Sequence, residues 1–526
     1  RGHCNLEDIV VISDKEVMNR SEKVVYKWDE VDWRKLVRSV FKLQKRIYQA
    51  SKSGAWKRMK RLQKLLLNSE SAKLLAVRRV TQINKGKKTA GVDGVKSLTP
   101  AQRLKLANEL KLSEKSKPVR RIWIPKPGRT EKRPLGIPTM ADRAKQALVK
   151  LVLEPEWEAK FAPNTYGFRP ARSCHDAIEA IYNAINQKNA YVLDADIKGC
   201  FDNIDYVALL KKINTFPRLR RVIKEWLKNG AMEGNVFQKT NAGTPQGGVI
   251  SPLLANIALH GLEHELKENL LNDLLQYAKQ KRKYQVGHKN AKDSISIVFY
   301  ADDFVVLHES KEIILKAKEY IERWLGKIGL KLNPVKTRVV HTLLSTDGNE
   351  PGFNFLGFSI RQYPTKTREK GYKTHIKPDQ KSQEKHKQTI DEKLGQMTAC
   401  TQDEVIRTLN PVIKGWSNYF HIGVSSKIFS NMDHYVFHKL WKWTRWRHSN
   451  KGLKWIKQKY FRRYKGNNWR FATSDTNRLA LHSETHIKRH VKVQGTRTPY
   501  DGDLQYWSKR SNKKNFTTND LAERCI

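Results

Sequence analysis

Residues 294–307 read SISIVFYADDFVVL, which sets two adjacent carboxylates between two apolar runs. Residues 294–299 alternate polar and apolar side chains, and residues 304–307 are a short apolar run, so both flanks favour β-strands. The pattern predicts a hairpin whose tight turn carries Asp302 and Asp303. Exposed carboxylates there suit Mg²⁺, which takes oxygen ligands and completes its shell with substrate phosphates. The alternative is a solvated Asp-Asp turn without chemistry.

The composition of the chain points to a polyanionic partner. Its 526 residues include 101 Lys and Arg against 52 Asp and Glu, a formal net charge of +49 at pH 7. Such an excess predicts tight, salt-sensitive binding to nucleic acid. A hydrophobic content of 39% is enough for folded cores, and the length allows roughly three to four domains.

Cysteine usage and hydropathy indicate the compartment. The five cysteines are far apart and form no C-x-x-C pair, so neither a disulfide framework nor a cysteine zinc site is expected. No apolar stretch reaches the roughly 20 residues that cross a bilayer, and the first residues lack a signal peptide. We expect a soluble protein in a reducing compartment, without a membrane partner.

A second strand supplies further carboxylates. Residues 191–197 read YVLDADI, and Asp194 and Asp196 share parity, so both project from one face. Periodicity alone does not choose between them. A strand bearing Asp196 and the hairpin bearing Asp302 and Asp303 would converge on two Mg²⁺ ions roughly 4 Å apart, one activating a 3′-hydroxyl and the other stabilising pyrophosphate.

The rest of the chain differs in composition and hydrophobic periodicity from one segment to the next. Basic amphipathic helices are predicted from about residue 33 to 85, with a break near Ser53 and Gly54. Residues 119–125 favour a strand, residues 133–138 an extended path, and residues 141–157 a helix. Residues 243–252 form a turn with three glycines, which is either a purely structural loop or a place where backbone approaches nucleic acid closely. From about residue 378 the chain becomes helical, basic and aromatic.

The order of these motifs resembles the blocks of a reverse transcriptase, and more narrowly a group II intron-encoded reverse transcriptase and maturase. The resemblance covers nearly the whole chain. It is carried, in order, by residues 121–138, 166–170 (YGFRP), 196–202 (DIKGCFD), 243–252, 300–303 (YADD), 329–337 (GLKLNPVKT) and 355–358 (FLGF).

The resemblance implies an α+β fold shaped as a right-hand polymerase, with fingers, a palm containing an antiparallel sheet, and a helical thumb. Residues 1–110 would be an N-terminal extension of basic helices that binds intron RNA, and residues 111–375 the fingers and palm. Residues 376–460 would form the thumb or maturase domain, and residues 461–526 a basic DNA-binding region. Many relatives continue into an H-N-H endonuclease with C-x-x-C pairs, and we expect no such domain in this chain.

The resemblance also implies roles for single residues. Asp196, Asp302 and Asp303 would be the catalytic carboxylates, and with the backbone carbonyl of Ile197 they would bind two Mg²⁺ ions. The expected nucleotide contacts are Phe201 beside the sugar 2′ position, Lys126 and Arg133 at the triphosphate, Gln246 against the incoming nucleotide, and Lys336 near the active site. Phe201 could equally be a core residue, and the two cations generic RNA contacts.

The C-terminal third indicates RNA and DNA binding. Residues 409–420 resemble the maturase signature. Lys414 stands where arginine is common, a change that retains the charge but loses the planar guanidinium group. Residues 441–470 contain eleven Lys and Arg, eight aromatics and no acidic residue, which suits phosphate contacts with stacking, although the tryptophans could instead be core. The expected RNA and DNA contacts are Arg169, Lys414, Trp416, Arg445, Arg447, Arg462, Arg463, Lys488 and Arg489.

Together these features predict an RNA-directed DNA polymerase that is also a maturase. It would bind its group II intron RNA as a ribonucleoprotein, assist splicing, and copy the intron into target DNA from dNTPs by target-primed synthesis. A bacterial cytoplasm, near the nucleoid, is the expected location, and an organelle is less favoured. The alternatives are a retron-type or other bacterial reverse transcriptase without maturase activity, and a splicing factor with an inactive polymerase core.

Overall fold

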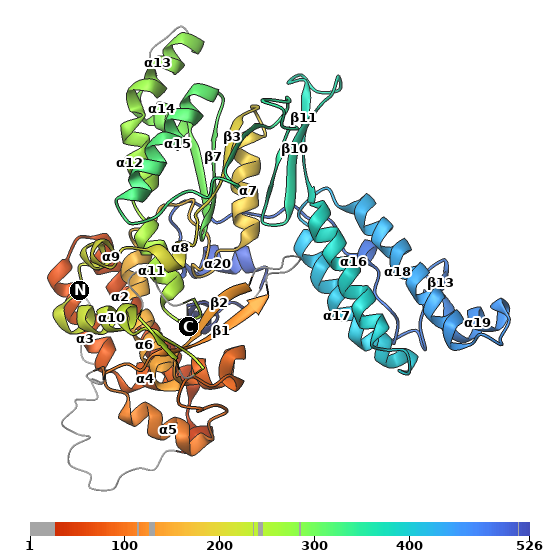
Figure 1. The fold of residues 1–526 in the computed structure, drawn as a ribbon, viewed down its shortest axis with the longest axis horizontal. Coiled ribbons are helices and arrows are strands. Elements are labelled where there is room, and N and C mark those ends of the chain that lie inside the picture. The colour runs from red at the N-terminus through yellow and green to blue at the C-terminus, as the bar shows by residue number, and fades with distance from the viewer. Residues whose placement is uncertain are drawn as a thin grey trace, which may run out of the picture.

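The computed structural model describes residues 27–112, 115–125, 132–234, 236–239, 243, 246–282, 286–513 and 515–525. They form a large body of helices and sheets, from which a long, mainly helical lobe projects to one side (Figure 1). Within these residues, no helix is both long and apolar enough to cross a lipid bilayer.

The N-terminal part of the body is helical, as the sequence predicts. The first helix, α2, ends one residue before Ser53, and Gly54 then adopts a left-handed φ of 70°, so the predicted break is confirmed. Apolar side chains spaced three and four apart, including Phe41 and Leu66, are fully buried against α6. The helices are α2 (Trp33–Lys52), α3 (Trp56–Asn68), α4 (Glu70–Arg78), α5 (Pro100–Glu109) and α6 (Met140–Glu158).

A peripheral sheet of four strands lies beside these helices, in the order β2-β1-β4-β5. Strand β1 runs antiparallel to β2 and parallel to β4. The predicted strand and the extended path after it are both present, and the turn between them, with Lys126, lies outside the described residues. The strands are β1 (Val119–Pro125), β2 (Lys132–Ile137), β4 (Ala231–Glu233) and β5 (Val236–Gln238).

The central sheet carries the hairpin predicted from residues 294–307. Its order is β6-β7-β3-β8, with antiparallel pairing throughout. Apolar residues such as Val305 and Phe304 are fully buried, since α7 and α15 pack against the sheet. The elements are β3 (Tyr191–Asp196), β6 (Ser296–Tyr300), β7 (Asp303–His308), β8 (Arg338–His341), α7 (Cys174–Ile185) and α15 (Lys311–Gly326).

Further elements complete the body. Short helices surround the central sheet, and a second small sheet, ordered β11-β10-β9, leads toward the lobe. They are α8 (Cys200–Asn203), α9 (Tyr206–Ile213), α10 (Pro217–Lys228), α11 (Ser251–Leu259), α12 (Leu262–Asn269), α13 (Leu271–Arg282), α14 (His288–Ser294), β9 (Phe353–Phe355), β10 (Phe358–Pro364) and β11 (Tyr372–Pro378).

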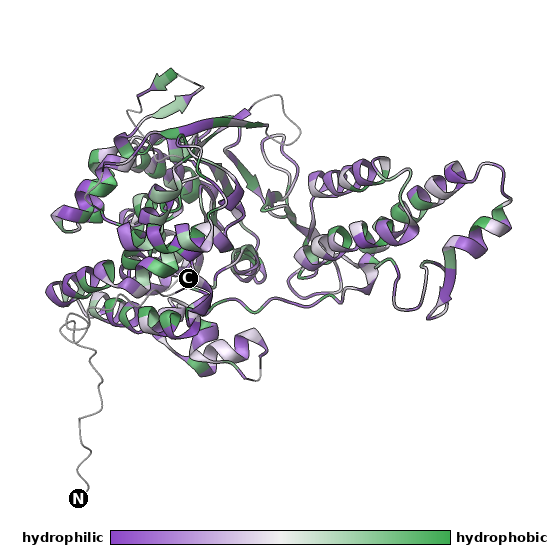
Figure 2. Cartoon of the chain, turned by 90° about the horizontal axis from the view of Figure 1, so that it is seen from below, coloured by the Kyte–Doolittle hydropathy of each residue, from purple (hydrophilic) through white to green (hydrophobic). Residues whose placement is uncertain are grey.

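The lobe has a hydrophobic core of its own, which includes Ile390, Leu409 and Trp443. Hydrophilic and hydrophobic residues alternate around its helices, as expected for amphipathic helices packed on one face (Figure 2). The expectation of a purely helical lobe is incomplete, because a hairpin follows the last helix. The elements are α16 (Gln380–Gly395), α17 (Gln402–Phe420), α18 (Ser426–Arg447), α19 (Leu453–Tyr460), β12 (Phe461–Tyr464) and β13 (Asn467–Phe471).

After the hairpin the chain returns from the lobe to the body. Tyr500, Trp507 and Leu521 are fully buried in the same core as the N-terminal helices. They flank or lie in α20 (Leu504–Ser511) and α21 (Thr518–Glu523), and α21 contacts α2. Figure 1 shows α20 within the body, far from the hairpin. The segment expected as one basic DNA-binding region is thus distributed between two distant places.

Candidate active site

Three carboxylates meet at one end of the central sheet. Asp303 begins β7 and lies opposite Asp196, the last residue of β3. Asp302 lies in the turn, directly after Ala301, whose φ of 59° is left-handed. The turn has the predicted position, but Asp303 belongs to the strand and pairs with Tyr300 across the hairpin. Strand register therefore brings together carboxylates more than a hundred residues apart in sequence.

These carboxylates repel one another. Burial raises the pKa of Asp303 to about 7, and repulsion from the charges of Asp302 and Asp196 contributes to this rise. Burial and the charge of Asp196 also raise the pKa of Asp302, while Arg133 and Lys336 act in the opposite direction. The end of the sheet thus concentrates negative charge that a cation would stabilise.

Asp196 is held in place by the loop that follows α15. The side-chain amide of Asn333 donates to Asp196 Oδ2 at 3.0 Å, and Lys336 Nζ donates to the same oxygen at 2.9 Å. The backbone nitrogen of Asn333 also donates to the backbone oxygen of Asp196, at 2.8 Å. Sequence reasoning did not identify Asn333, although it lies in the quoted block of residues 329–337.

Asp194 has different surroundings, although it shares a strand face with Asp196. Its Oδ2 accepts a hydrogen bond from Arg338 Nε at 3.1 Å, and Arg338 is its cross-strand partner on β8. Burial raises the pKa of Asp194, and the pairing with Arg338 lowers it. The structure therefore distinguishes two aspartates that periodicity could not.

The donor set fits a divalent cation by its chemistry. In the described part of the chain, no group of three or more His, Cys, Asp or Glu side chains is arranged to hold a metal ion as it stands. Asp196, Asp302 and Asp303 nevertheless bring hard carboxylate oxygens together, and their mutual repulsion would favour a divalent cation among them. Ile197, whose carbonyl was expected as a further ligand, directly follows β3 and has a buried side chain.

The expected nucleotide contacts gather near this end of the sheet. Phe201 is half-buried and meets Phe168 edge to face, with ring centroids 6.4 Å apart. Gln246 Nε2 donates to Asp202 Oδ2 at 3.0 Å. Arg133 is exposed on β2 and acts electrostatically on both Asp202 and Asp302. These residues come from three segments that are far apart in the sequence.

Two glycines of the turn at residues 243–252 are required by close packing. Gly243 has a φ of 89°, and a Cβ atom there would overlap the backbone of Asp202. Gly247 has a φ of 110°, and a Cβ atom there would lie 2.7 Å from the backbone oxygen of Gly136. These glycines fix the loop beside Phe201 and β2, so the structural reading of the turn holds for them.

A third glycine supports the turn at residues 301–303, and no local pattern in the sequence indicates this role. Gly167 packs so tightly under the turn that a Cβ atom would overlap the backbone nitrogen of Ala301. Its carbonyl accepts a hydrogen bond from the buried side chain of Asn256 at 2.8 Å. Beside it, the backbone nitrogen of Tyr166 donates to Phe299 O at 3.0 Å. Residues 166 and 167 thus brace the hairpin.

Six of the expected RNA and DNA contacts are exposed, and one of them, Arg489, forms an ion pair with Glu179 at 2.6 Å. Arg445 lies near the end of α18, and Arg462 and Arg463 lie on β12, in the outer part of the lobe (Figure 1). The other two, Lys414 on α17 and Lys488, are also open to solvent. These side chains are available to a nucleic acid.

The other three make contacts inside the protein, which the expectation of nucleic-acid binding did not include. Arg169 is 5% exposed and forms a two-point ion pair with Glu158 at 2.8 and 2.9 Å. Trp416 stacks on His386 with ring centroids 4.6 Å apart. Arg447 donates hydrogen bonds to the backbone carbonyls of residues 398–400. Composition could not show this, because internal partners follow from tertiary packing.

Comparisons with known families and proteins agree with this geometry. Residues 124–360 match the reverse transcriptase (RNA-dependent DNA polymerase) family, residues 28–110 the N-terminal domain of reverse transcriptase, and residues 383–461 the group II intron, maturase-specific domain. The chain is 32% identical to protein YkfC of Escherichia coli (strain K12) over 328 residues, which cover 57% of this chain and 83% of YkfC.

The chain belongs to the family of group II intron-encoded reverse transcriptases and maturases. It is also 33% identical over 325 residues to the group II intron-encoded protein LtrA of Lactococcus lactis subsp. cremoris. That match covers 53% of this chain and 53% of LtrA, so the chain spans about half of that relative. Among solved structures, telomerase from Candida albicans matches weakly, with a TM-score of 0.34 and 14% identity over 66% of this chain and 62% of that one.

Proposed function

We propose that this protein is an RNA-directed DNA polymerase and the maturase of a group II intron. The observation that carries the polymerase activity is the meeting of Asp196, Asp302 and Asp303 at one end of the central sheet. The matched maturase-specific domain, residues 383–461, favours intron binding over a polymerase without maturase work.

The elements suit the parts of a right-hand polymerase. The central sheet would be the palm, the sheet of β1, β2, β4 and β5 the fingers, and α16 to α18 the thumb. We propose domain boundaries at residues 110, 375 and 460, as the sequence predicts. For residues 461–526 we propose instead a hairpin that extends the thumb, followed by a segment that returns to the body, because these parts lie in different cores.

The residues around the carboxylates have distinct tasks in DNA synthesis. When bound, two Mg²⁺ ions held by Asp196, Asp302, Asp303 and the carbonyl of Ile197 would activate the primer 3′-hydroxyl and stabilise the departing pyrophosphate. Arg133, and Lys126 beyond the described residues, would bind the triphosphate. Gln246 would face the incoming dNTP, and Phe201, backed by Phe168, would exclude a ribose 2′-hydroxyl.

A role for Lys336 follows from its ion pair with Asp196. Its ammonium lies on Asp196 Oδ2, 2.9 Å away, on an exposed loop. There its positive charge would offset the repulsion among the three carboxylates. Asn333, which bonds the same oxygen, would fix the orientation of the carboxylate.

The maturase function would rest on shape and charge. The lobe exposes Lys414, Arg445, Arg462 and Arg463 along more than one element. Together with the basic N-terminal helices they would bind the folded intron RNA, and the intron itself would perform the splicing chemistry. Target DNA would then serve as the primer for copying the intron.

The test separates the two functions. Asp302→Ala should abolish primer extension with dNTPs and Mg²⁺ on an RNA template, because one of the three carboxylate ligands is lost. Assistance of intron splicing by the same purified protein should stay largely intact. Asp194→Asn is the matched control, since it removes a charge from the same strand face without touching the site. Equal loss of synthesis and splicing in Asp302→Ala would contradict separable functions.

A further inference from the structure

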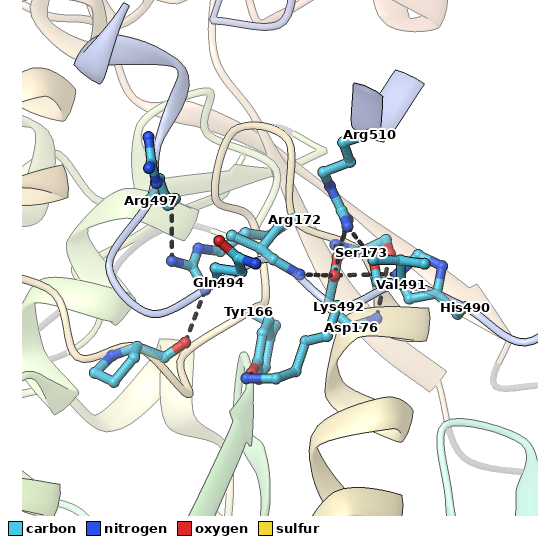
Figure 3. A network of polar contacts seen from close by, with 12 residues as sticks. Tyr166, Arg172, Ser173, Asp176, His490, Val491, Lys492, Gln494, Arg497 and Arg510 are labelled. Carbon is cyan, nitrogen blue, oxygen red and sulfur yellow. Dashed lines mark hydrogen bonds and ion pairs between the residues drawn. The ribbon is translucent and has the colours of Figure 1, made fainter. Parts of the chain in front are cut away.

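The segment that joins the lobe to the body runs past α7 and the loop that supports the hairpin of β6 and β7. We call residues 485–498 the C-terminal strap. It leaves the lobe where the backbone nitrogen of Lys488 donates to His421 O at 3.0 Å, just after α17. It ends at Thr498, next to the buried Pro499 and Tyr500 of the body. Figure 3 shows the strap passing the first turn of α7.

The strap is anchored on one buried carboxylate, Asp176. This side chain is 0% exposed and accepts hydrogen bonds from His490 Nε2 at 3.1 Å and from the backbone nitrogen of Val493 at 2.8 Å. Arg510 of α20 reaches both of its oxygens, at 2.8 and 3.0 Å. Burial would raise the pKa of Asp176, but these donors hold it below its ordinary value. A buried carboxylate with so many partners is costly to disrupt.

A second connection runs from the strap to the loop beneath the catalytic turn. Arg172 is 9% exposed, and its Nη2 donates to Gly495 O at 2.9 Å and to Arg497 O at 3.1 Å. Its guanidinium lies over the ring of Tyr166, 5.5 Å from the centroid. Lys492 Nζ of the strap donates to the Tyr166 hydroxyl at 3.4 Å. Figure 3 shows Arg172 and Lys492 on either side of this ring.

The loop of residues 164–167 connects the strap to the turn at residues 301–303. Tyr166 N donates to Phe299 O at 3.0 Å, and Phe299 N donates to Asn164 O at 2.9 Å, so the loop is bonded to β6 on both sides of Thr165. Gly167, the next residue, lies against the backbone of Ala301. Only Tyr166 and Gly167 therefore separate the strap from the residue that precedes Asp302.

We propose that the C-terminal strap is a positioning element of the polymerase. Its contacts through Asp176, Arg172 and Lys492 keep the turn at residues 301–303 in position. The proposal rests on the polymerase function given above. It assigns a role in catalysis to a segment whose composition indicates nucleic-acid binding. A catalytic constellation tolerates little displacement, since an error of about 1 Å can cost on the order of a hundredfold in rate.

The first variant is Asp176→Asn, tested in the full chain. The rate constant for single-nucleotide incorporation at saturating dNTP should fall by about tenfold, because the turn loses its fixed position. Affinity for primer–template and KM for dNTP should change little, since the hydrogen bonds of Asp176 reach neither the expected nucleotide contacts nor the exposed cations of the lobe. Hydrogen exchange at residues 300–304 should also quicken, a change visible without any catalysis. Lys513→Met, which breaks an ion pair with Asp520 in the same C-terminal segment, should leave all four quantities unchanged.

A double-mutant cycle keeps the proposal testable even if Asp176→Asn does not fold. Lys492→Met and Tyr166→Phe each remove one side of the contact at the Tyr166 hydroxyl. Each should lower the incorporation rate severalfold, and the double variant should be no slower than the slower single one. Additive effects, or rates equal to wild type in folded protein, would overturn the proposal. A fall in rate that is matched by an equal loss of primer–template affinity would also overturn it.

The assay distinguishes this proposal from the function on which it rests. Wild-type protein and Asp302→Ala are measured beside the strap variants. A wild type without DNA synthesis would refute the polymerase itself. An active wild type, an inactive Asp302→Ala and fully active strap variants would refute only the strap.

Discussion

The end of the central sheet and the outer lobe use charge in opposite ways. At the sheet, three carboxylates are held close together by strand register, and Asn333 and Lys336 fix one of them. On the lobe, exposed cations such as Arg445 and Arg462 are spread over separate elements, and no acidic residue occurs among residues 441–470. A reaction requires exact placement of few groups, whereas binding a large polyanion requires many charges with loose placement.

The difference predicts how each region responds to substitution. At the sheet, a displacement of one backbone segment should cost orders of magnitude in rate. On the lobe, each lost charge should cost little by itself, and its effect should depend on salt. The two regions should also respond independently, because the lobe has a separate hydrophobic core.

The largest effect is expected from a single methyl group added under the turn at residues 301–303. Gly167→Ala would bring a Cβ atom into the backbone of Ala301, so the turn must move. We expect DNA synthesis to fall by about a hundredfold or more, while binding of intron RNA to the lobe stays close to wild type. Primer extension and a filter-binding assay on the same preparation measure the two quantities.

Gly415→Ala on the lobe is the matched control for Gly167→Ala. Gly415 lies inside α17, and nothing lies within 4 Å of a Cβ atom built there. Alanine should therefore stabilise this helix, by up to about 1 kcal/mol, and leave both activities unchanged. If the two glycines responded alike, the contrast between the precise sheet and the tolerant lobe would be wrong.

The position of the carboxylate turn could be predicted from the sequence for a physical reason. In a chain with twice as many basic as acidic residues, Asp302 and Asp303 stand out between two strand patterns. The choice between Asp194 and Asp196 needed either a family resemblance or the position of Arg338, because both aspartates share one strand face.

Sequence reasoning was weaker wherever function depends on distant partners. Arg169 and Arg489 look like any other cations in a basic chain, yet Glu158 and Glu179 neutralise them. The course of residues 485–525 back to the body also left no local signal, since its anchor, Asp176, lies about three hundred residues earlier in the chain. Local patterns show strands, turns and charge, but not which charges find an internal partner.

An intermediate effect is expected from charge removal on the lobe. Arg445→Gln, Arg462→Gln and Arg463→Gln combined should weaken binding to intron RNA and reduce the salt slope of log K by about 2, at roughly 0.7 per phosphate contact. Primer extension on a short template at saturating concentration should be retained. Binding measured at several salt concentrations gives the slope.

Arg447→Gln sharpens the same test. Arg447 lies close to Arg445 on α18, but its guanidinium donates to backbone carbonyls in the turn after α16. Its loss should lower the melting temperature and leave the salt slope unchanged. A reduced slope in Arg447→Gln would mean that internal partners do not exclude a cation from RNA binding.

The smallest effect concerns the pH dependence of lobe stability. His386 is 4% exposed, stacks on Trp416 and has a ring nitrogen 2.7 Å from Nε2 of His482. Burial, and then the charge of His482, lower the pKa of His386 to about 3. The unfolded chain binds a proton near pH 6.5 and the folded lobe does not, so stability is fully present above pH 6.5 and falls as the pH decreases toward 3. The slope should be about 1.4 kcal/mol per pH unit in this window. Urea unfolding of wild type and His386→Gln between pH 5 and 7 measures it, and the variant should lose that part of the slope, whereas His434→Gln, on the exposed face of α18, should keep it.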